Sequence, residues 1–134
     1  MNQLTGQITA IESNHHVSLV DVTVEGEVFS ATLLETPETA PYLRLGQPVT
    51  MLFKETEVSL AKNLSGLITL RNRFPVTITE IERGTIMSAV RLAYCGLPLT
   101  SVVTTRSLDK LGLVPGDIVE ALVKANEVVL KAES

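Results

Sequence analysis

The sequence contains no tryptophan, only three phenylalanines and two tyrosines, and a single cysteine among its 134 residues. So few aromatic side chains disfavour a single-strand nucleic-acid binder, because such proteins stack successive bases on aromatic rings. Positive charge is also scarce: 11 Lys and Arg stand against 15 Asp and Glu, for a net charge of −4. This balance argues against direct nucleic-acid binding, which requires cations to neutralise phosphates. The lone cysteine excludes an internal disulfide framework.

Long apolar runs are absent as well. No stretch approaches the roughly 18 uninterrupted apolar residues of a membrane span. Residues 1–3 lack the basic and apolar regions with which a signal peptide begins. We therefore expect a cytoplasmic protein that does not insert into a membrane.

What the sequence does contain is a repeat. When the chain is aligned with itself at an offset of 70 residues, sixteen pairs are identical without a gap, from Asn2/Asn72 to Leu60/Leu130. A fixed offset of this kind indicates a tandem duplication. A unit of about 60 residues buries only about 60% of its unfolded surface, so it is marginal alone. We expect the repeats to pack against each other or against a second chain, and the protein to form a homo-oligomer.

Within each repeat, short alternating apolar and polar runs predict strands, separated by turns rich in Gly and Pro. The expected strands of the first repeat are 7–13, 17–24, 28–34, 48–53 and 56–61, and those of the second are 76–82, 87–92, 99–104, 118–124 and 127–130. A helical turn or two fits residues 35–45, and Ser107 to Gly112 predicts a short helix with Ser107 as its N-cap. The predicted fold is all-β: two tandem OB-like barrels, at 1–63 and 64–134. Residues 62–71 form an apolar linker that we expect to pack, crossing between barrels or chains.

No arrangement of a nucleophile beside a base is visible, so we expect no enzyme. His15 and His16 are adjacent in a predicted turn without acidic or cysteine neighbours, which favours loop residues over metal ligands. Cys95 has no nearby cation or helix terminus to activate its thiol.

The second repeat does contain a set of hydrogen-bond donors suited to a small oxyanion, whose oxygens are all acceptors. These donors are Thr69, Arg71, Thr104, Thr105, Ser107 and Lys124. The alternative is that Thr104 and Ser107 only cap a turn, while Arg71 and Lys124 are solvated surface. Spacing alone favours this alternative.

Several motifs in this repeat resemble the molybdate-binding Mop repeat, the TOBE-type unit of molbindins. Thr69-Leu70-Arg71-Asn72 resembles the Ser-Ala-Arg-Asn opening of that repeat. The runs at 81–84, 102–107, 111–116 and 123–128 follow in the same order and spacing. The resemblance covers the whole second repeat and, more weakly, the first. The pair of repeats is similar to the C-terminal half of molybdate-responsive transcription regulators, to two-repeat molbindins and to the tail of molybdate-importer ATPases.

The resemblance implies a molybdate or tungstate site built from groups of more than one repeat or chain, in a dimer or a trimer. Its residues would be Thr69, Arg71, Asn72, Thr104, Thr105, Ser107, Lys124 and Ala125, the last through its backbone N–H. The first repeat departs from this pattern: Leu34, Glu35, Pro37 and Glu55 stand at the positions of Thr104, Thr105, Ser107 and Ala125, and no Arg precedes Asn2. Of the charged and hydroxyl donors, only Lys124 has a matching counterpart, Lys54. The first repeat is therefore expected to be a structural partner with at most a weak site.

Two functions of different class remain open at this stage. One is cytoplasmic binding of molybdate or tungstate for storage or sensing, without a metal ion or organic cofactor. The other is a ligand-free interaction module derived from such a binder. The donors of the second repeat favour the first function, and the altered first repeat keeps the second open.

Overall fold

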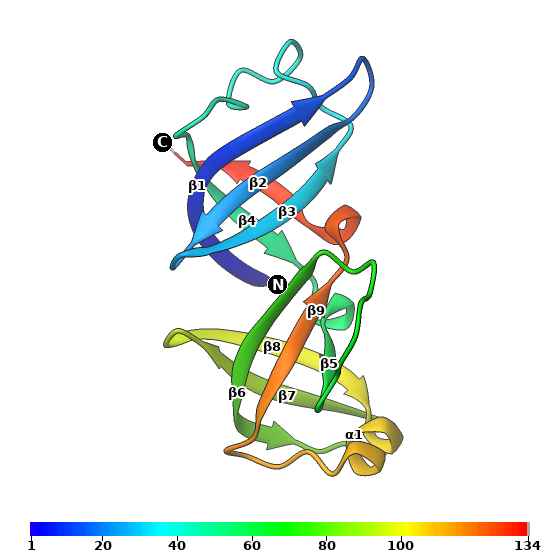
Figure 1. Cartoon of the computed structure of the whole chain (residues 1–134). Helices are drawn as coiled ribbons and strands as arrows, with labels where there is room; N and C mark the ends of the chain where they lie inside the picture. Colours follow the sequence, from blue (N-terminus) through cyan, green and yellow to red (C-terminus); the bar gives the residue numbers. More distant parts are fainter. Residues whose placement is uncertain (134) are drawn as a thin grey trace. The chain divides into compact units, whose positions relative to one another are not determined.

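The computed structural model describes residues 1–133, which form two compact units, each built on one curled five-stranded sheet (Figure 1). Unit 1 contains residue 1, residues 3–53 and the C-terminal segment from Lys124. Unit 2 contains Asn2 and residues 54–123. Within the described residues, no helix is long and apolar enough to cross a membrane.

The sheet of unit 1 has the strand order β10-β4-β1-β2-β3. Its strands are β1 (Asn2–Ser13), β2 (Ser18–Val24), β3 (Glu27–Leu33), β4 (Pro48–Phe53) and β10 (Val129–Ala132). Every second residue of β2 is buried, as expected for a strand with one face on a core. Val20, Val22, Phe29 and Met51 are among the buried apolar side chains.

The sheet of unit 2 has the order β5-β9-β6-β7-β8. Its strands are β5 (Ser59–Ala61), β6 (Asn72–Glu82), β7 (Met87–Tyr94), β8 (Leu97–Thr104) and β9 (Ile118–Val123), and its helix is α1 (Thr105–Leu111). Two 3₁₀ turns, η1 (Glu55–Glu57) and η2 (Ala125–Glu127), precede β5 and β10. The buried rings of Phe74 and Tyr94 meet edge to face, with centroids 5.2 Å apart. The buried Ser101 hydroxyl of β8 donates to the Val58 carbonyl beside β5, at 2.6 Å, and so joins the two edges of the curled sheet.

The predicted repeat appears in the backbone as well as in the sequence. β1 and β6 change register after Ile8 and Ile78, respectively. At each of these positions the isoleucine amide donates to the carbonyl of the residue before the fourth strand of the repeat: Gln47 at 3.0 Å and Asp117 at 2.9 Å. The hairpin residues Glu25 and Cys95 both have positive φ, at 49° and 48°. The prediction of two tandem, mainly β, OB-like units is confirmed.

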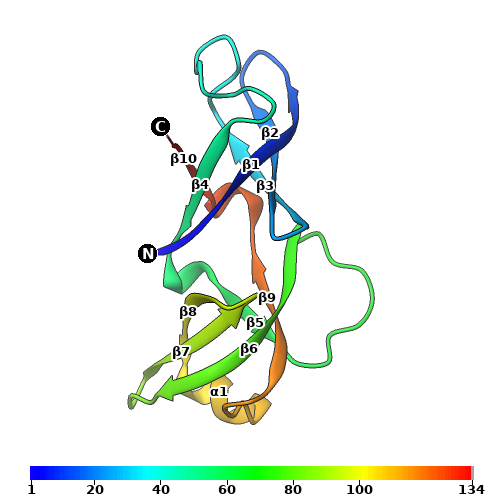
Figure 2. The ribbon, with the colours of Figure 1, turned by 90° about the vertical axis from the view of Figure 1, so that its left-hand side faces the viewer.

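The final strand of each repeat joins the sheet of the other repeat. β5 follows the first repeat in the chain but pairs with β9 in unit 2. β10 follows the second repeat but pairs with β4 in unit 1 (Figure 2). The boundary near residue 63 therefore separates the two repeats of the sequence but not the two compact units. Unit 1 contains the last strand of the second repeat, and unit 2 contains the last strand of the first.

The connection before the fourth strand differs between the repeats. In the second repeat α1 begins at Thr105, so the expected N-cap at Ser107 is wrong and Thr104 caps the helix instead. Gly112 ends α1 in the left-handed conformation, as predicted. In the first repeat, residues 34–47 form turns and no helix. Pro41 has no N–H for a helical bond to Pro37, whose carbonyl accepts from Arg44 instead, at 3.2 Å.

The linker at 62–71 is tied to unit 2 through its backbone. Arg73 Nη2 donates to the Leu64 carbonyl at 3.1 Å and pairs with Glu120 at 3.0 Å. The side chains of Leu67 and Ile68 are nevertheless exposed, Leu67 completely. The expectation that these apolar side chains pack is therefore not met within one chain.

The exchanged strand gives a direct test. Leu130→Ala should lower the free energy of unfolding by about 2–4 kcal/mol, because it leaves a cavity at a buried site. The loss should appear as faster amide exchange in β4, which is encoded in the first repeat, and hydrogen exchange measured by mass spectrometry would locate it. Lys131→Ala, on the same strand with an exposed side chain, is the matched control. Faster amide hydrogen exchange confined to β9 would contradict the pairing of β10 with β4.

Candidate functional site

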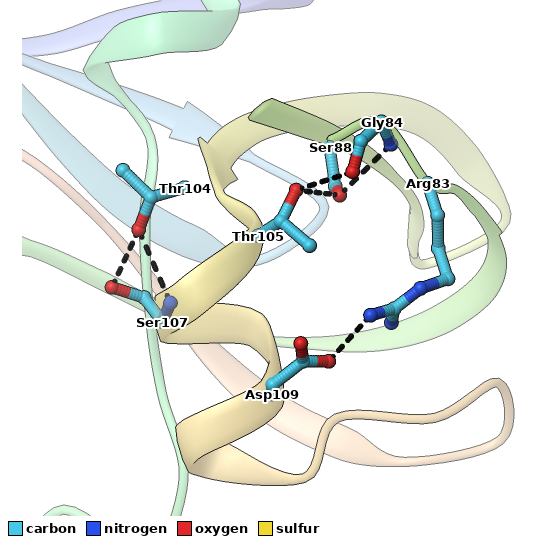
Figure 3. A network of polar contacts seen from close by, with 7 residues as sticks. All are labelled: Arg83, Gly84, Ser88, Thr104, Thr105, Ser107 and Asp109. Carbon is cyan, nitrogen blue, oxygen red and sulfur yellow. Dashed lines mark hydrogen bonds and ion pairs between the residues drawn. The ribbon is translucent and has the colours of Figure 1, made fainter. Parts of the chain in front are cut away.

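Two exposed hydroxyls meet where β8 ends and α1 begins. Thr104 has extended backbone angles, φ −67° and ψ 141°, and its Oγ1 accepts from the Ser107 amide at 3.1 Å. This is the usual N-cap arrangement, in which a hydroxyl satisfies an N–H that the helix leaves without an internal partner. The Thr104 hydroxyl also donates to Ser107 Oγ, at 2.8 Å. The two side chains are thus held together at the surface (Figure 3).

The direction of this bond determines what the pair offers to a ligand. Ser107 Oγ accepts a hydrogen bond from the Thr104 hydroxyl, so its own proton is directed elsewhere. A hydroxyl that accepts a hydrogen bond becomes a stronger donor in turn. The pair is therefore suited to an acceptor-rich ligand, such as an oxyanion, at the surface beside Ser107.

Thr104 also lines a pocket. It has a volume of about 210 Å³ and is lined by Thr85, Ile86, Thr104 and Arg106. Arg106 brings a guanidinium group, a multiple donor that is always charged. Arg106 is not among the site residues predicted from the sequence, although its position between Thr104 and Ser107 was the available signal.

Thr105 differs from its two neighbours because its side chain is buried. Its hydroxyl donates to the Gly84 carbonyl at 2.8 Å and lies 2.7 Å from Ser88 Oγ, which is also buried. Figure 3 shows these contacts on the opposite side of the helix start from the Thr104–Ser107 pair. The Thr105 hydroxyl, predicted to bind the anion, is therefore already hydrogen-bonded inside unit 2.

The predicted site residues before β6 lie at the other end of the sheet. Thr69 and Arg71 are exposed and precede Asn72, the first residue of β6, which is buried. Thr104 pairs with Met87 at one end of β7, whereas β6 begins beyond the other end of β7. A single unit 2 therefore does not bring Arg71 and Thr104 together.

The remaining two predicted residues belong to unit 1. Lys124 is exposed and precedes η2, where its carbonyl accepts from the Glu127 amide at 2.9 Å. It directly follows Val123, the ladder partner of Asn72. Arg71 and Lys124 thus each flank the last pair of that ladder in sequence, and Ala125 begins η2.

The corresponding region of the first repeat has different contacts. Glu35 occupies the position of Thr105, and its carboxylate accepts from the Tyr42 hydroxyl at 2.7 Å. Burial, together with this carboxylate, raises the pKa of Tyr42 above its ordinary value. Ser18, the counterpart of Ser88, is fully buried, and its hydroxyl has no hydrogen-bond partner among residues 1–133.

The histidines and the cysteine considered above as metal ligands or a reactive thiol are all exposed in turns. His15 and His16 are exposed next to each other, and Cys95 is exposed in its hairpin. Among the described residues, no group of three or more His, Cys, Asp or Glu side chains could hold a metal ion.

The fold and these hydroxyls define a small tandem β-barrel protein with a polar site where a strand enters a helix. The chain belongs to the TOBE domain family, whose model matches residues 1–60 and 68–130. The resemblance to molbindins is thereby confirmed.

Similar proteins share a connection with molybdenum. The chain is 31% identical over 135 residues to the molybdenum transport protein ModE of Herbaspirillum seropedicae, covering 98% of this chain and 50% of that protein. It is 43% identical over 63 residues to the molybdenum-pterin-binding protein MopA of Rhodobacter capsulatus, covering 46% of this chain and 24% of that protein. The chain thus spans half or less of these curated relatives.

A solved structure matches almost the whole chain. It is that of the cytoplasmic molybdate-binding protein ModG, in a form with molybdate bound. The TM-score is 0.91 at 30% sequence identity, and the match covers 98% of this chain and 96% of that one.

The contrast between the two buried serines predicts opposite mutational effects. Ser88→Ala should lower the free energy of unfolding by about 1–3 kcal/mol, because it leaves buried partners without a hydrogen bond. Ser18→Ala should be neutral or slightly stabilising, because that hydroxyl has no partner to lose. Urea unfolding of both variants measures the difference. Equal losses would show that Ser18 is as well bonded as Ser88.

Proposed function

We propose that this protein binds molybdate, or tungstate, without catalysing a reaction, and serves molybdenum homeostasis or sensing in the cytoplasm. One observation carries the proposal: the exposed Thr104–Ser107 hydroxyl pair lies in a fold that matches the molybdate-bound ModG structure over almost its whole length. The ligand is the oxyanion itself, so no separate metal site or organic cofactor is needed.

The chemistry of the second repeat suits this ligand. A tetrahedral dianion accepts hydrogen bonds at every oxygen and favours hydroxyl, guanidinium, ammonium and backbone N–H donors. Charged donors contribute the strongest of these bonds. We assign contacts with the anion to Thr69, Arg71, Thr104, Ser107, Lys124 and the backbone N–H of Ala125. The buried Asn72 has a structural role, as does its counterpart Asn2, whose amide group both donates to and accepts from the Thr100 backbone at 2.8 Å.

The separation of these groups supports a site shared between chains. Arg71 and Thr104 belong to opposite ends of the unit 2 sheet, so one unit 2 cannot supply both to one small anion. A second copy of the chain can bring its Thr104 and Ser107 to the Arg71 of the first. Exposed Leu67 and Ile68 of the linker would then be covered by the neighbouring chain.

The first repeat acts as a structural partner in this proposal. Leu34 and Pro37 replace the two hydroxyls, and Glu35 is bound to Tyr42. Glu55 replaces Ala125, and its carboxylate would repel a dianion.

The exposed linker leucine and isoleucine also favour a second candidate, a ligand-free assembly module. Such a module would associate through the linker without binding an anion. Titration with molybdate separates the two functions.

Calorimetric titration should show molybdate binding that depends on the second repeat. Arg71→Ala and Lys124→Ala should each weaken binding by about 1.5–3 kcal/mol, the scale of a charge-assisted hydrogen bond. Sulfate should compete poorly, because it is a smaller tetrahedron that cannot reach all the fixed donors together.

Lys54→Ala is the matched control, since Lys54 is the first-repeat counterpart of Lys124 and lies outside the proposed site. It should change the affinity little. Loss of binding in this variant with full binding in Lys124→Ala would assign the site to the other repeat. No heat from the wild type would leave the assembly module as the function.

A shared site also requires a homo-oligomer. Light scattering of the purified protein should give a dimer or a trimer of the 14.5 kDa chain. Leu67→Asp should shift the distribution toward smaller species, because it places a charge in the apolar contact. A wild-type monomer that still binds molybdate would overturn the shared site.

A further inference from the structure

The buried side chain of Thr105 takes part in a closed cycle of hydrogen bonds. Thr105 Oγ1 donates to the Gly84 carbonyl, so its single proton is used there. Ser88 Oγ must then donate to Thr105 Oγ1, at 2.7 Å. The Gly84 amide closes the cycle by donating to Ser88 Oγ, at 3.3 Å. Each hydroxyl therefore donates and accepts, which strengthens the set as a whole.

The same loop holds the start of α1 at two further points. The Thr105 amide donates to the Ile86 carbonyl at 2.8 Å. Arg83 Nη2 pairs with Asp109 Oδ1, in the next turn of the helix, at 2.6 Å (Figure 3). The loop at 83–86 thus holds Thr105, which lies between Thr104 and Arg106 in sequence, through both its side chain and its backbone amide.

The path of this loop depends on a glycine. A Cβ placed on Gly84 would lie 2.2 Å from the Met87 carbonyl oxygen, closer than real atoms approach. A side chain at this position would displace the loop and, with it, the carbonyl that accepts from Thr105.

The corresponding position of the first repeat lacks this cycle of hydrogen bonds. Ser18 and Ser88 have the same ladder register, with Leu33 and Val103 as partners. Two residues beyond those partners stand Glu35 and Thr105. Glu35 is bound to Tyr42 and leaves Ser18 without a partner among the described residues, and no helix follows β3.

We propose that Thr105 is a positioning residue: with Ser88 and Gly84 it fixes the start of α1, and thereby the spacing of the Thr104 and Ser107 hydroxyls that select molybdate over a smaller tetrahedral anion. The inference rests on the proposed function. Thr105 does not contact the anion; it acts through the two side chains beside it. Donors fixed in advance lose less freedom on binding and fit one ion size better than another.

Thr105→Val tests this because valine keeps the branched shape and replaces the hydroxyl with a methyl group, which cannot form a hydrogen bond. Molybdate should bind about tenfold more weakly, the change expected for the loss of one buried hydrogen bond. The preference for molybdate over sulfate should fall by a similar factor. Thr105→Ser should restore both, since it returns the hydroxyl. Competition titrations with molybdate and sulfate measure the affinities.

A second measurement does not depend on any ligand. Amide exchange at Ser107, whose N–H bonds to Thr104 Oγ1, should become faster in Thr105→Val and return in Thr105→Ser. Ser101→Ala is the matched control, because it removes another buried hydroxyl bond of unit 2, to Val58. It should leave the Ser107 exchange and the molybdate preference unchanged. Ser88→Ala provides the same test if Thr105→Val does not fold.

The outcomes separate the two proposals. Wild-type binding with an unchanged anion preference or unchanged Ser107 exchange in Thr105→Val would overturn the positioning role. An equal change in Ser101→Ala would also overturn it, because the effect would then be general destabilisation. If the wild type binds no molybdate, the proposed function fails, and the Ser107 exchange alone decides whether Thr105 holds the helix start.

Discussion

The pairing of the fourth strand of each repeat, β4 with β10 and β9 with β5, is the constraint on which the rest of this structure depends. Without β10, β4 would present an unpaired row of backbone N–H and C=O groups, and without β5 the same would hold for β9. Each strand is supplied by the other repeat. The two sequence repeats therefore cannot complete their sheets separately. Covalent connection at residues 53–54 and 123–124 keeps each exchanged strand at high effective concentration.

Within this frame the two repeats have diverged at one junction. The backbone ladder, the register shifts after Ile8 and Ile78 and the buried serines are shared. The residue two positions beyond the ladder partner of each serine is different, Glu35 in the first repeat and Thr105 in the second, and it determines the local polar contacts. Thr105 turns inward to Ser88 and Gly84, whereas Glu35 bonds to Tyr42. The repeat with the inward hydroxyl has a capped helix with two exposed hydroxyls, and the other has turns.

In the proposed function, this difference makes the second repeat the binding site and the first repeat its structural partner. A small anion needs several donors held at one spacing, and the start of α1 provides two such donors on a fixed backbone. The anion's other proposed partners, Arg71 and Lys124, flank the Asn72–Val123 end of the ladder. Assembly of chains and binding of the anion are linked in this proposal, because the same contacts would complete both.

The sequence by itself determined the duplication, the β character and the alternation of the strands, because these depend on local patterns of apolar and turn residues. It also singled out Thr104 and Ser107 as donors for an anion, which stays a prediction; their spacing of three residues reflects a local cap, in which Thr104 and not Ser107 is the N-cap. Only the tertiary structure decided which sheet each fifth strand joins, since Ser59–Ala61 and Val129–Ala132 fit either sheet equally by pattern. It also decided the direction of Thr105, which depends on a hydroxyl and a carbonyl distant in sequence, at Ser88 and Gly84. Such long-range polar contacts leave no periodic signal in the chain.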